Sequence, residues 1–403
     1  MQLQKILLMS LDYKQLFFFL VMIPLIGCAT SLSSNSTVSL LTCDEGTEIY
    51  ALFGHGAIRI QDKSQSIDEI YNWGMFEFSE NQAEFGYDFA KGKLVYKLGR
   101  QKFQHFIYEY IYYKRGVREQ QLNLNLQQKQ KLYDAILKNY LPENRNYKYD
   151  FFYDNCSSRI RDLLITSIGD KLILAKHPDA DKYSFREIID FRLNSTPWLD
   201  LGIDLVLGKK IDTIVSNHHL MFLPSYLEEI LDASYVIDNL GGKVPLVKNK
   251  TELLTNEIEI DSDISSISIY FWVLLVFTLI VGIINRNRFS KFWFGLILLI
   301  GSLLSIVLVF MWVGTDHDAT KDNLNLLWAN PLLLLSFVSI FSKKLQSKLT
   351  YFFLSMTILF FMVVLFWIIS PQEFNTAIRP LIIVFTLVHY FLFNNSKKLT
   401  NRP

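Results

Sequence analysis

The stretch Tyr149-Asp150-Phe151-Phe152-Tyr153-Asp154-Asn155-Cys156-Ser157-Ser158-Arg159 sets a thiol at the start of an expected helix. We expect that helix to run from Cys156 through Leu164, with Asp154 or Asn155 as its N-cap. In the first turn, the positive end of the helix dipole favours a thiolate, and backbone N–H groups can hold an oxyanion. The run Asp-Asn-Cys is also too polar for an ordinary core segment. Cys156 is therefore a candidate nucleophile.

A second motif, Phe53-Gly54-His55-Gly56-Ala57, supplies a base. Glycine on both sides of His55 allows close backbone approach. Because cysteine is a strong nucleophile even when only partly ionised, one histidine within hydrogen-bond reach is enough to activate it. His55 and Cys156 together indicate acyl chemistry of the kind that papain-like enzymes perform, with the histidine earlier in the chain. The alternative is a buried, inert cysteine and a structural turn histidine.

A third residue should orient the imidazole. Asn72, in Tyr71-Asn72-Trp73-Gly74, lies one predicted strand after His55 and is our choice. Asp68 and Asp154 are competitors, and a turn at the end of a strand is the other explanation for Asn72.

The part of the chain around these motifs reads as mixed α and β. Short runs rich in β-branched and aromatic residues, separated by Gly, Asp and Ser, predict a small antiparallel sheet. The predicted strands are Val38–Thr42, Glu48–Phe53, Gly56–Ile60 and Ile67–Asn72. Apolar residues at helical spacing predict a helix over Leu126–Tyr140, ending before Pro142.

Composition excludes several classes of function, and the N-terminal segment predicts export. The net charge of +1 over 403 residues gives no electrostatic case for nucleic acid, and three cysteines do not make a disulfide framework. Histidines and carboxylates are not at metal-ligand spacing, so neither a metal nor another cofactor is expected. Lys5, Lys14 and the apolar stretch Leu16–Ile26 predict an export signal or anchor over residues 1–31. Cys28 would then be a possible lipidation site.

The last third of the chain predicts a membrane domain over residues 261–403, following an exported domain over 32–260. Five apolar runs have about the length that spans ~30 Å of hydrocarbon, the last being short. They are Ile267–Ile284, Phe292–Val313, Leu324–Phe341, Tyr351–Ser370 and Pro380–Phe393. Lysine and arginine gather in the first, third and last of the segments that follow these runs, which puts those segments in the cytoplasm. Residue 260 is then outside, in agreement with the export signal.

The chain resembles the Lnb N-terminal periplasmic domain family, which the motifs match in order over nearly the whole chain after the signal. The matching segments are Phe53–Arg59, Tyr71–Phe76, Lys91–Tyr96, Pro142–Arg145, Tyr149–Arg159, Pro197-Trp198 through Gly202-Ile203-Asp204, Met221–Pro224, Thr315–His317 and Asn323–Trp328. The resemblance implies an α+β fold: a permuted papain-like (NlpC-like) domain outside the cytoplasm, followed by an all-α transmembrane bundle. It also implies His55 as base and Cys156 as nucleophile.

Family members with an assigned activity are lipoprotein N-acyltransferases. The resemblance thus implies an inner-membrane enzyme, its catalytic domain in the periplasm, that moves an acyl chain from a phospholipid to the N-terminal amine of a diacylated lipoprotein. We expect Asn155, Asp154 and Arg59 to contact substrate. Two alternatives remain: a papain-like cell-envelope hydrolase, acting as a peptidoglycan peptidase, an amidase or a phospholipase, and a non-catalytic envelope anchor.

The outer loop Gly314–Asn323 contains Asp316-His317-Asp318 close to the bilayer. Ionisable residues at this depth are candidates for function, so Asp316 and His317 are expected to contact a lipid head group or complete the site. A solvated loop is the other interpretation.

Overall fold

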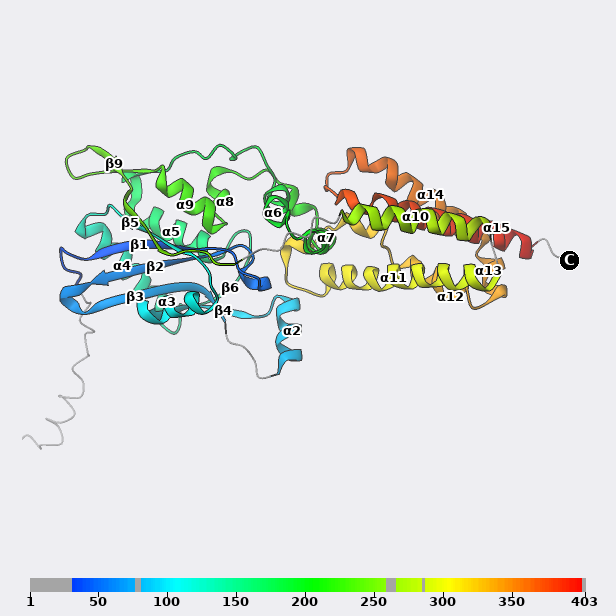
Figure 1. Ribbon diagram of the computed structural model, residues 1–403, viewed down its shortest axis with the longest axis horizontal. Helices are drawn as coiled ribbons and strands as arrows, with labels where there is room; N and C mark the ends of the chain where they lie inside the picture. The colour runs from blue at the N-terminus through cyan, green and yellow to red at the C-terminus, as the bar shows by residue number, and fades with distance from the viewer. Residues whose placement is uncertain (1–30, 77–80, 259–265, 285–286, 401–403) are drawn as a thin grey trace, which may run out of the picture.

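The structure is a computed structural model that describes residues 31–76, 81–258, 266–284 and 287–400. The predicted signal, with Cys28, lies outside the described residues except for Ser31, and so does the predicted boundary at residue 260. A mixed α/β unit is followed by a block of helices, and the two lie end to end along the long axis of the molecule (Figure 1).

An antiparallel sheet of seven strands forms the centre of the first unit, in the order β10-β5-β1-β2-β3-β4-β6. These strands are β1 (Thr37–Cys43), β2 (His55–Asp62), β3 (Ile67–Met75), β4 (Val95–Lys102), β5 (Val117–Leu122), β6 (Asn146–Lys148) and β10 (Val247–Leu254). A small sheet joins β7 (Leu172–Ile173), β8 (Tyr235–Ile237) and β9 (Lys243–Pro245). Cys43 and His55 are cross-strand partners at one end of the β1–β2 pair.

Helices cover both faces of the large sheet. Leu40 and Ile58 belong to the core that includes side chains of α4 and α5, whereas Leu41 and Ala57 belong to the core under α3. Side chains of a strand alternate between faces, which is why neighbouring residues enter different cores. The helices of this unit are α2 (Gln82–Lys91), α3 (Phe103–Tyr112), α4 (Leu126–Tyr140), α5 (Cys156–Ile168), α6 (Phe185–Leu193), α7 (Pro197–Val206), α8 (Asn217–Leu220) and α9 (Pro224–Asp232), with 3-10 helices η1 (Ile49–Ala51), η2 (Lys63–Gln65), η3 (Gly169–Lys171) and η4 (Lys209–Asp212).

Three of the four predicted strands and the predicted helix Leu126–Tyr140 are present, but the strand predicted over Glu48–Phe53 is wrong. That segment forms η1, and its backbone groups pair locally. The Ala51 N–H donates to Glu48 O at 2.8 Å, and Ala51 O accepts from Gly46 N–H at 2.9 Å and Gly54 N–H at 3.1 Å. The chain then reverses at Gly54, where φ is +74°.

The second unit contains four helical segments long and apolar enough to cross a membrane among the described residues: Ile267–Ile284, Arg288–Val313, Thr350–Ile369 and Thr376–Thr400. Its elements are α10 (Ile267–Ile284), α11 (Asn287–Val313), α12 (Leu332–Ser339), α13 (Lys343–Lys348), α14 (Thr350–Phe366) and α15 (Arg379–Thr400), with 3-10 helices η5 (Asp318–Thr320), η6 (Leu324–Leu327), η7 (Trp367–Ile369) and η8 (Thr376–Ile378).

The third predicted run, Leu324–Phe341, is not one continuous helix. It divides into η6 and the eight residues of α12, whose rise of about 12 Å is well short of ~30 Å. Asn323 and Asn325 explain the break, because they bind the end of α7. The Asn323 amide donates to Leu205 O at 2.7 Å and Val206 O at 3.0 Å, and the Asn325 amide donates to Asp204 O at 3.1 Å. These bonds satisfy carbonyls that a helix end leaves without partners.

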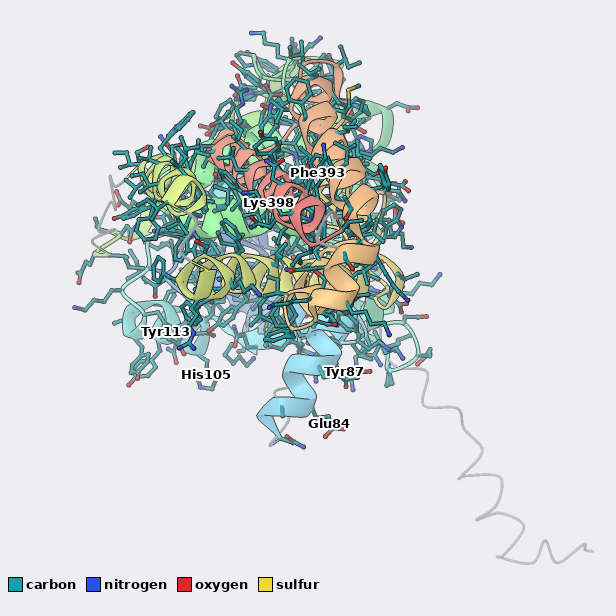
Figure 2. The ribbon with its side chains drawn as sticks, turned by 90° about the vertical axis from the view of Figure 1, so that its right-hand side faces the viewer. Glu84, Tyr87, His105, Tyr113, Phe393 and Lys398 are labelled. Carbon is teal, nitrogen blue, oxygen red and sulfur yellow. The ribbon has the colours of Figure 1, made fainter. Side chains whose placement is uncertain are left out.

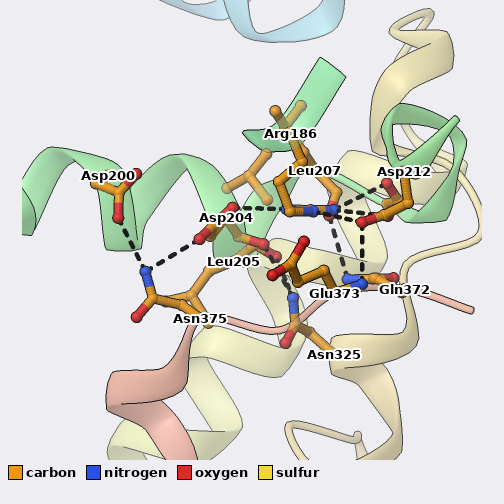
Figure 3. A network of polar contacts seen from close by, with 12 residues as sticks. Arg186, Asp200, Asp204, Leu205, Leu207, Asp212, Asn325, Gln372, Glu373 and Asn375 are labelled. Atoms are coloured by element: carbon orange, nitrogen blue, oxygen red, sulfur yellow. Dashed lines mark hydrogen bonds and ion pairs between the residues drawn. The ribbon is translucent and has the colours of Figure 1, made fainter. Parts of the chain in front are cut away.

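Buried charges complete this junction between the two units (Figure 3). The Arg186 guanidinium is 1% exposed and pairs with Asp204 at 2.7 Å and Asp212 at 2.8 Å. From the helical block, Asn375 donates to Asp200 and Asp204 at 3.0 Å each. Removing one partner of such a group leaves a buried charge uncompensated, which costs about 3–5 kcal/mol. The network therefore holds the α/β unit in a defined position on the helical block.

Candidate functional site

Cys156 is the first residue of α5, and Asn155 is the N-cap. The Asn155 Oδ1 accepts from Ser158 N–H at 2.9 Å, and the Ser158 hydroxyl accepts from Asn155 N–H at 2.8 Å. The Asn155 amide also donates to the carbonyls of Phe151 at 2.7 Å and Phe222 at 2.8 Å. Asn155 is buried, and its side chain is committed to these bonds. It positions the start of α5 and is not available to bind substrate, which corrects the expectation from the sequence.

His55 is the first residue of β2, and its ring is hydrogen-bonded to the Cys156 side chain. The Nε2–H of His55 donates to Asn72 Oδ1 at 3.0 Å. Asn72 is buried on the neighbouring strand β3. Because Nε2 is used by Asn72, Nδ1 is the nitrogen left to face the sulfur. The structure thus brings Cys156, His55 and Asn72 together from three elements.

The glycines on both sides of His55 lie close to neighbouring segments. Gly54 has a left-handed backbone, and a Cβ there would lie 2.7 Å from Cys43 O. A Cβ at Gly56 would lie 3.3 Å from the Ile160 side chain of α5. These close approaches let the start of β2 come up against the start of α5.

The electrostatics of the pair favour its charged form. Burial by itself raises the pKa of the Cys156 thiol, but the His55 charge, the His55 hydrogen bond, the Gly56 N–H and the Ser157 hydroxyl lower that pKa to about 7. Burial lowers the pKa of His55, and its bonds and charge interactions with Cys156 and Asn72 raise it above its ordinary value overall. The interactions between the two groups therefore favour a thiolate beside an imidazolium, as in activated cysteine nucleophiles.

Cys43 is a second buried thiol, and it lacks the histidine and the hydrogen-bond donors that surround Cys156. It is 1% exposed in the core under α3, and burial raises its pKa to about 12 despite a hydrogen bond with Tyr110. Two buried cysteines of one domain thus have opposite shifts. The difference comes from the histidine and the donors around Cys156.

An aromatic cluster lies beside the thiol. The rings of Tyr96 and Tyr149 stack with centroids 4.5 Å apart, and the Tyr147 ring lies 6.5 Å from each. Burial raises the pKa of Tyr147, and the charge of nearby Cys156 raises it further, so its hydroxyl stays protonated. That hydroxyl is buried and has no hydrogen-bond partner among the residues that the structure describes. It faces Gly74, where a Cβ would lie 3.9 Å from it. A buried donor without a partner is costly and rare in folded proteins.

Asp154 and Arg59, which were expected to contact substrate, both form ion pairs. Asp154 binds Arg159 through two bonds, at 2.6 and 2.7 Å, and the Arg159 guanidinium lies 3.6 Å from the centre of the Tyr147 ring. Arg59 does not join the site. Arg59 lies four residues after His55 on β2. Its guanidinium binds Asp68 at 2.8 Å and Glu119 at 3.1 Å. That ion pair also removes Asp68 as a partner for His55.

The outer loop meets the α/β unit at α2. Asp316 N–H donates to Lys91 O at 2.9 Å, and His317 Nε2–H donates to Phe89 O at 3.0 Å. The Asp316 carboxylate lies 3.5 Å from Lys148 Nζ, next to Tyr147 and Tyr149 in sequence. Further along the loop, Asp318 and Ala319 line a cavity of about 190 Å³ together with Asp150, Phe152, Tyr153, Lys210, Ile211 and Thr213. The loop thus docks onto the unit that carries Cys156, close to the turn that precedes it.

One group of carboxylates among the described residues is close enough to hold a cation. Oxygens of Asp190, Asp200 and Asp204 lie within 4.8 Å of one another. Asp190 and Asp200 share a hydrogen bond, Asn375 donates to Asp200 and Asp204, and Arg186 pairs with Asp204. Burial, followed by the neighbouring carboxylates, raises the pKa values of Asp190 and Asp200. A shared proton and the partners at the junction account for this group.

Sequence reasoning missed Tyr147 and the Gly56 N–H. Tyr147 lies in the aromatic run just before the Cys156 motif, so its place in the sequence was the available signal. The Gly56 N–H carries no side-chain signal, and its contact with the sulfur appears only when β2 is set against α5.

Two family models match the chain. The model described as the Lnb N-terminal periplasmic domain matches residues 29–190, which include all three residues of the centre. The model described as the Lnb transmembrane domain matches residues 262–398, which include the outer loop. No curated protein and no solved structure matches the chain. The resemblance inferred from the motifs is confirmed: the chain is a membrane protein with a periplasmic domain, and it belongs to the Lnb family.

Proposed function

We propose that the protein is a lipoprotein N-acyltransferase that carries a fatty acyl chain on Cys156. The single observation that supports this most is the buried Cys156–His55 pair, with a thiol pKa lowered to about 7. Membership of the Lnb family suggests a lipoprotein-modifying membrane enzyme, and the helical block provides a bilayer setting. The acyl donor is a phospholipid, and the acceptor is the N-terminal amine of a diacylated lipoprotein.

In the first half-reaction, the Cys156 thiolate attacks the ester carbonyl carbon of the phospholipid. A C–S bond forms, and the carbonyl oxygen becomes an oxyanion. When the oxyanion collapses, the C–O ester bond breaks and the His55 imidazolium gives its proton to the departing glycerol oxygen. The products are a lysophospholipid and a thioester on Cys156, with His55 left neutral.

We assign three donors to the oxyanion. The N–H groups of Cys156 and Ser157 open α5 and have no carbonyl four residues back within that helix. The Tyr147 hydroxyl is the third, because it is buried, protonated, close to Cys156 and without a partner. A single donor of this kind contributes about 10²–10³-fold to the rate.

In the second half-reaction, the lipoprotein amine attacks the thioester carbonyl. A C–N bond forms, neutral His55 takes the proton from the nitrogen, and the C–S bond breaks. The thiolate and the imidazolium are then restored together. Thioesters accept amines readily, so the cycle requires no ATP and no metal.

The same proposal includes the finer fold and the topology. A histidine on a strand that precedes the cysteine helix fits a permuted papain-like domain over residues 32–260, anchored by a membrane domain over 261–403. The domain faces the periplasm from the inner membrane, after a signal over residues 1–31. The third crossing is then made by the broken segment η6–α12, and the next helix, α13, begins with Lys343 and Lys344 at the cytoplasmic side.

The test uses purified full-length protein in phospholipid nanodiscs with a diacylated lipopeptide. Wild type and Cys43→Ala are expected to form triacylated lipopeptide, and Cys156→Ala and His55→Ala are expected to lose it. Cys43→Ala is the matched control, because it removes the other buried thiol. Conversion by Cys156→Ala would rule the proposal out. Release of free fatty acid without N-acylation would identify a phospholipase instead.

A further inference from the structure

We propose that α2 lies on the surface of the bilayer that holds the helical block, with at least one of its exposed aromatic side chains among the lipid head groups. The partner is the phospholipid leaflet on the side of the α/β unit. This proposal concerns membrane contact alone and does not depend on the acyl-transfer reaction.

The first argument is the attachment of α2 to the end of a membrane helix. Its C-terminal carbonyls, those of Phe89 and Lys91, are bound by His317 and Asp316, and a Cβ at Gly92 would lie 3.2 Å from the His317 ring. His317 follows the end of α11 at Val313 by four residues, a reach of at most about 14 Å. The head-group layer on each side of the hydrocarbon is about 5–8 Å deep. The attached end of α2 is therefore held at or near that layer.

The second argument is what lies beneath α2. Figure 1 shows α2 at right angles to α11, along the plane that a bilayer would take. Figure 2, seen from the end of the helical block, shows α2 with Glu84 and Tyr87 projecting beyond the outline of the block. None of the described helices of the block covers the space on the block's side of this projecting part (Figure 1 and Figure 2), so in a membrane that space is filled by lipid.

The third argument is the composition of its exposed surface. Tyr87 is 55% exposed and Phe89 43%, and Val95, just after the helix, is 61% exposed. The Lys91 Nζ lies 5.4 Å from the centre of the Tyr87 ring. Aromatic rings accompanied by lysine are typical of the membrane–water interface, where the ring is half buried and the ammonium reaches water.

A second contact joins the α/β unit to the start of a membrane helix. The Trp198 ring of α7 lies 5.9 Å from the Tyr270 ring near the start of α10. Both side chains are more than half exposed. This aromatic contact, and the hydrogen bonds from His317 and Asp316 to α2, both join the α/β unit to the end of a membrane helix, and so place the unit at the same level as α2.

Photocrosslinking tests this directly. A benzophenone amino acid replaces Tyr87 or Phe89 in the full-length protein, in nanodiscs of phosphatidylethanolamine and phosphatidylglycerol. Tyr108 of α3 is the matched control, because it is also an exposed tyrosine on a helix, 72% exposed, but far from the block. After irradiation, phospholipid adducts are counted by mass spectrometry.

Residues 87 and 89 are two positions apart in α2 and so lie on nearly opposite faces of the helix. Both are used so that each face is probed, and we expect adducts at the position that faces the leaflet at several times the level found at position 108. Adducts at neither position above the level at 108 would overturn the proposal. So would adducts at 87 and 89 that join α2 to protein only.

Discussion

The Nε2–H of His55 donates to Asn72 Oδ1 at 3.0 Å, and this bond assigns the two ring nitrogens to different tasks. With Nε2 held by the amide, Nδ1 is directed at the Cys156 sulfur. Asn72, on the neighbouring strand β3, therefore fixes the orientation of the His55 ring. A base acts only while it is in hydrogen-bond reach of its proton, so Asn72 should matter to the rate.

Asn72→Ala should slow acylation of Cys156 by about 10²-fold, the lower end of what a positioned acid–base group contributes. Asn72→Asp keeps an oxygen acceptor for Nε2–H and should recover part of the loss. The measurement is thioester formation in a single turnover, with Asn146→Ala on exposed β6 as control. A rate for Asn72→Ala equal to that of wild type would contradict the assignment.

The pKa of about 7 for Cys156 predicts the pH dependence of its reactivity. Because this pKa is depressed, the thiolate is present above pH 7, and alkylation by iodoacetamide should fall about tenfold for each pH unit below it. His55→Ala removes the main opposing charge and should move the midpoint upward. Cys43, with a pKa of about 12, should stay unmodified throughout. Equal labelling of both cysteines at pH 7 would show that the two environments do not differ in this way.

Tyr147→Phe separates catalysis from stability. Loss of an oxyanion donor should lower the acylation rate by about 10²-fold or more. The thermal midpoint should not fall, because the variant removes a buried hydroxyl that has no partner. Tyr96→Phe, from the same aromatic cluster, is the control and should keep its activity. A Tyr147→Phe enzyme of full activity would exclude the hydroxyl from the oxyanion site.

The carboxyl pair at the junction predicts how stability changes with pH. Burial, and then neighbouring carboxylates, raise the pKa values of Asp190 and Asp200 above the ordinary 3.8. The folded state therefore binds more protons than the unfolded state, and the stabilisation present near pH 4 is lost as pH rises through the raised values. The thermal midpoint in nanodiscs should fall between about pH 5 and pH 9. Asp190→Asn should flatten this slope, and exposed Asp170→Asn should not. An unchanged slope in Asp190→Asn would show that the pair does not titrate as described.

The sequence predicted the centre better than its surroundings. The Cys156 helix, the strand that begins at His55 and the place of Asn72 follow from local signals: an N-cap residue, flanking glycines and alternating side chains. β5 and β10 were missed because their sequences, Val117–Leu122 and Val247–Leu254, are mostly polar and pair at one edge of the sheet. The prediction of a continuous third span was wrong because a hydropathy profile does not show that Asn323 and Asn325 donate hydrogen bonds to carbonyls at the end of α7. Arg59 was misplaced for a related reason, since its ion-pair partners Asp68 and Glu119 come from two other strands.

The central claim is that Cys156 carries the acyl chain, and intact-protein mass spectrometry tests it most directly. Full-length protein is incubated in phospholipid nanodiscs without acceptor, and the adduct is mapped to a residue. We predict one fatty acyl chain on Cys156, removed by hydroxylamine and by added diacylated lipopeptide, and absent from His55→Ala. An active enzyme that carries no acyl group on Cys156, or carries it on Cys43, would contradict the account.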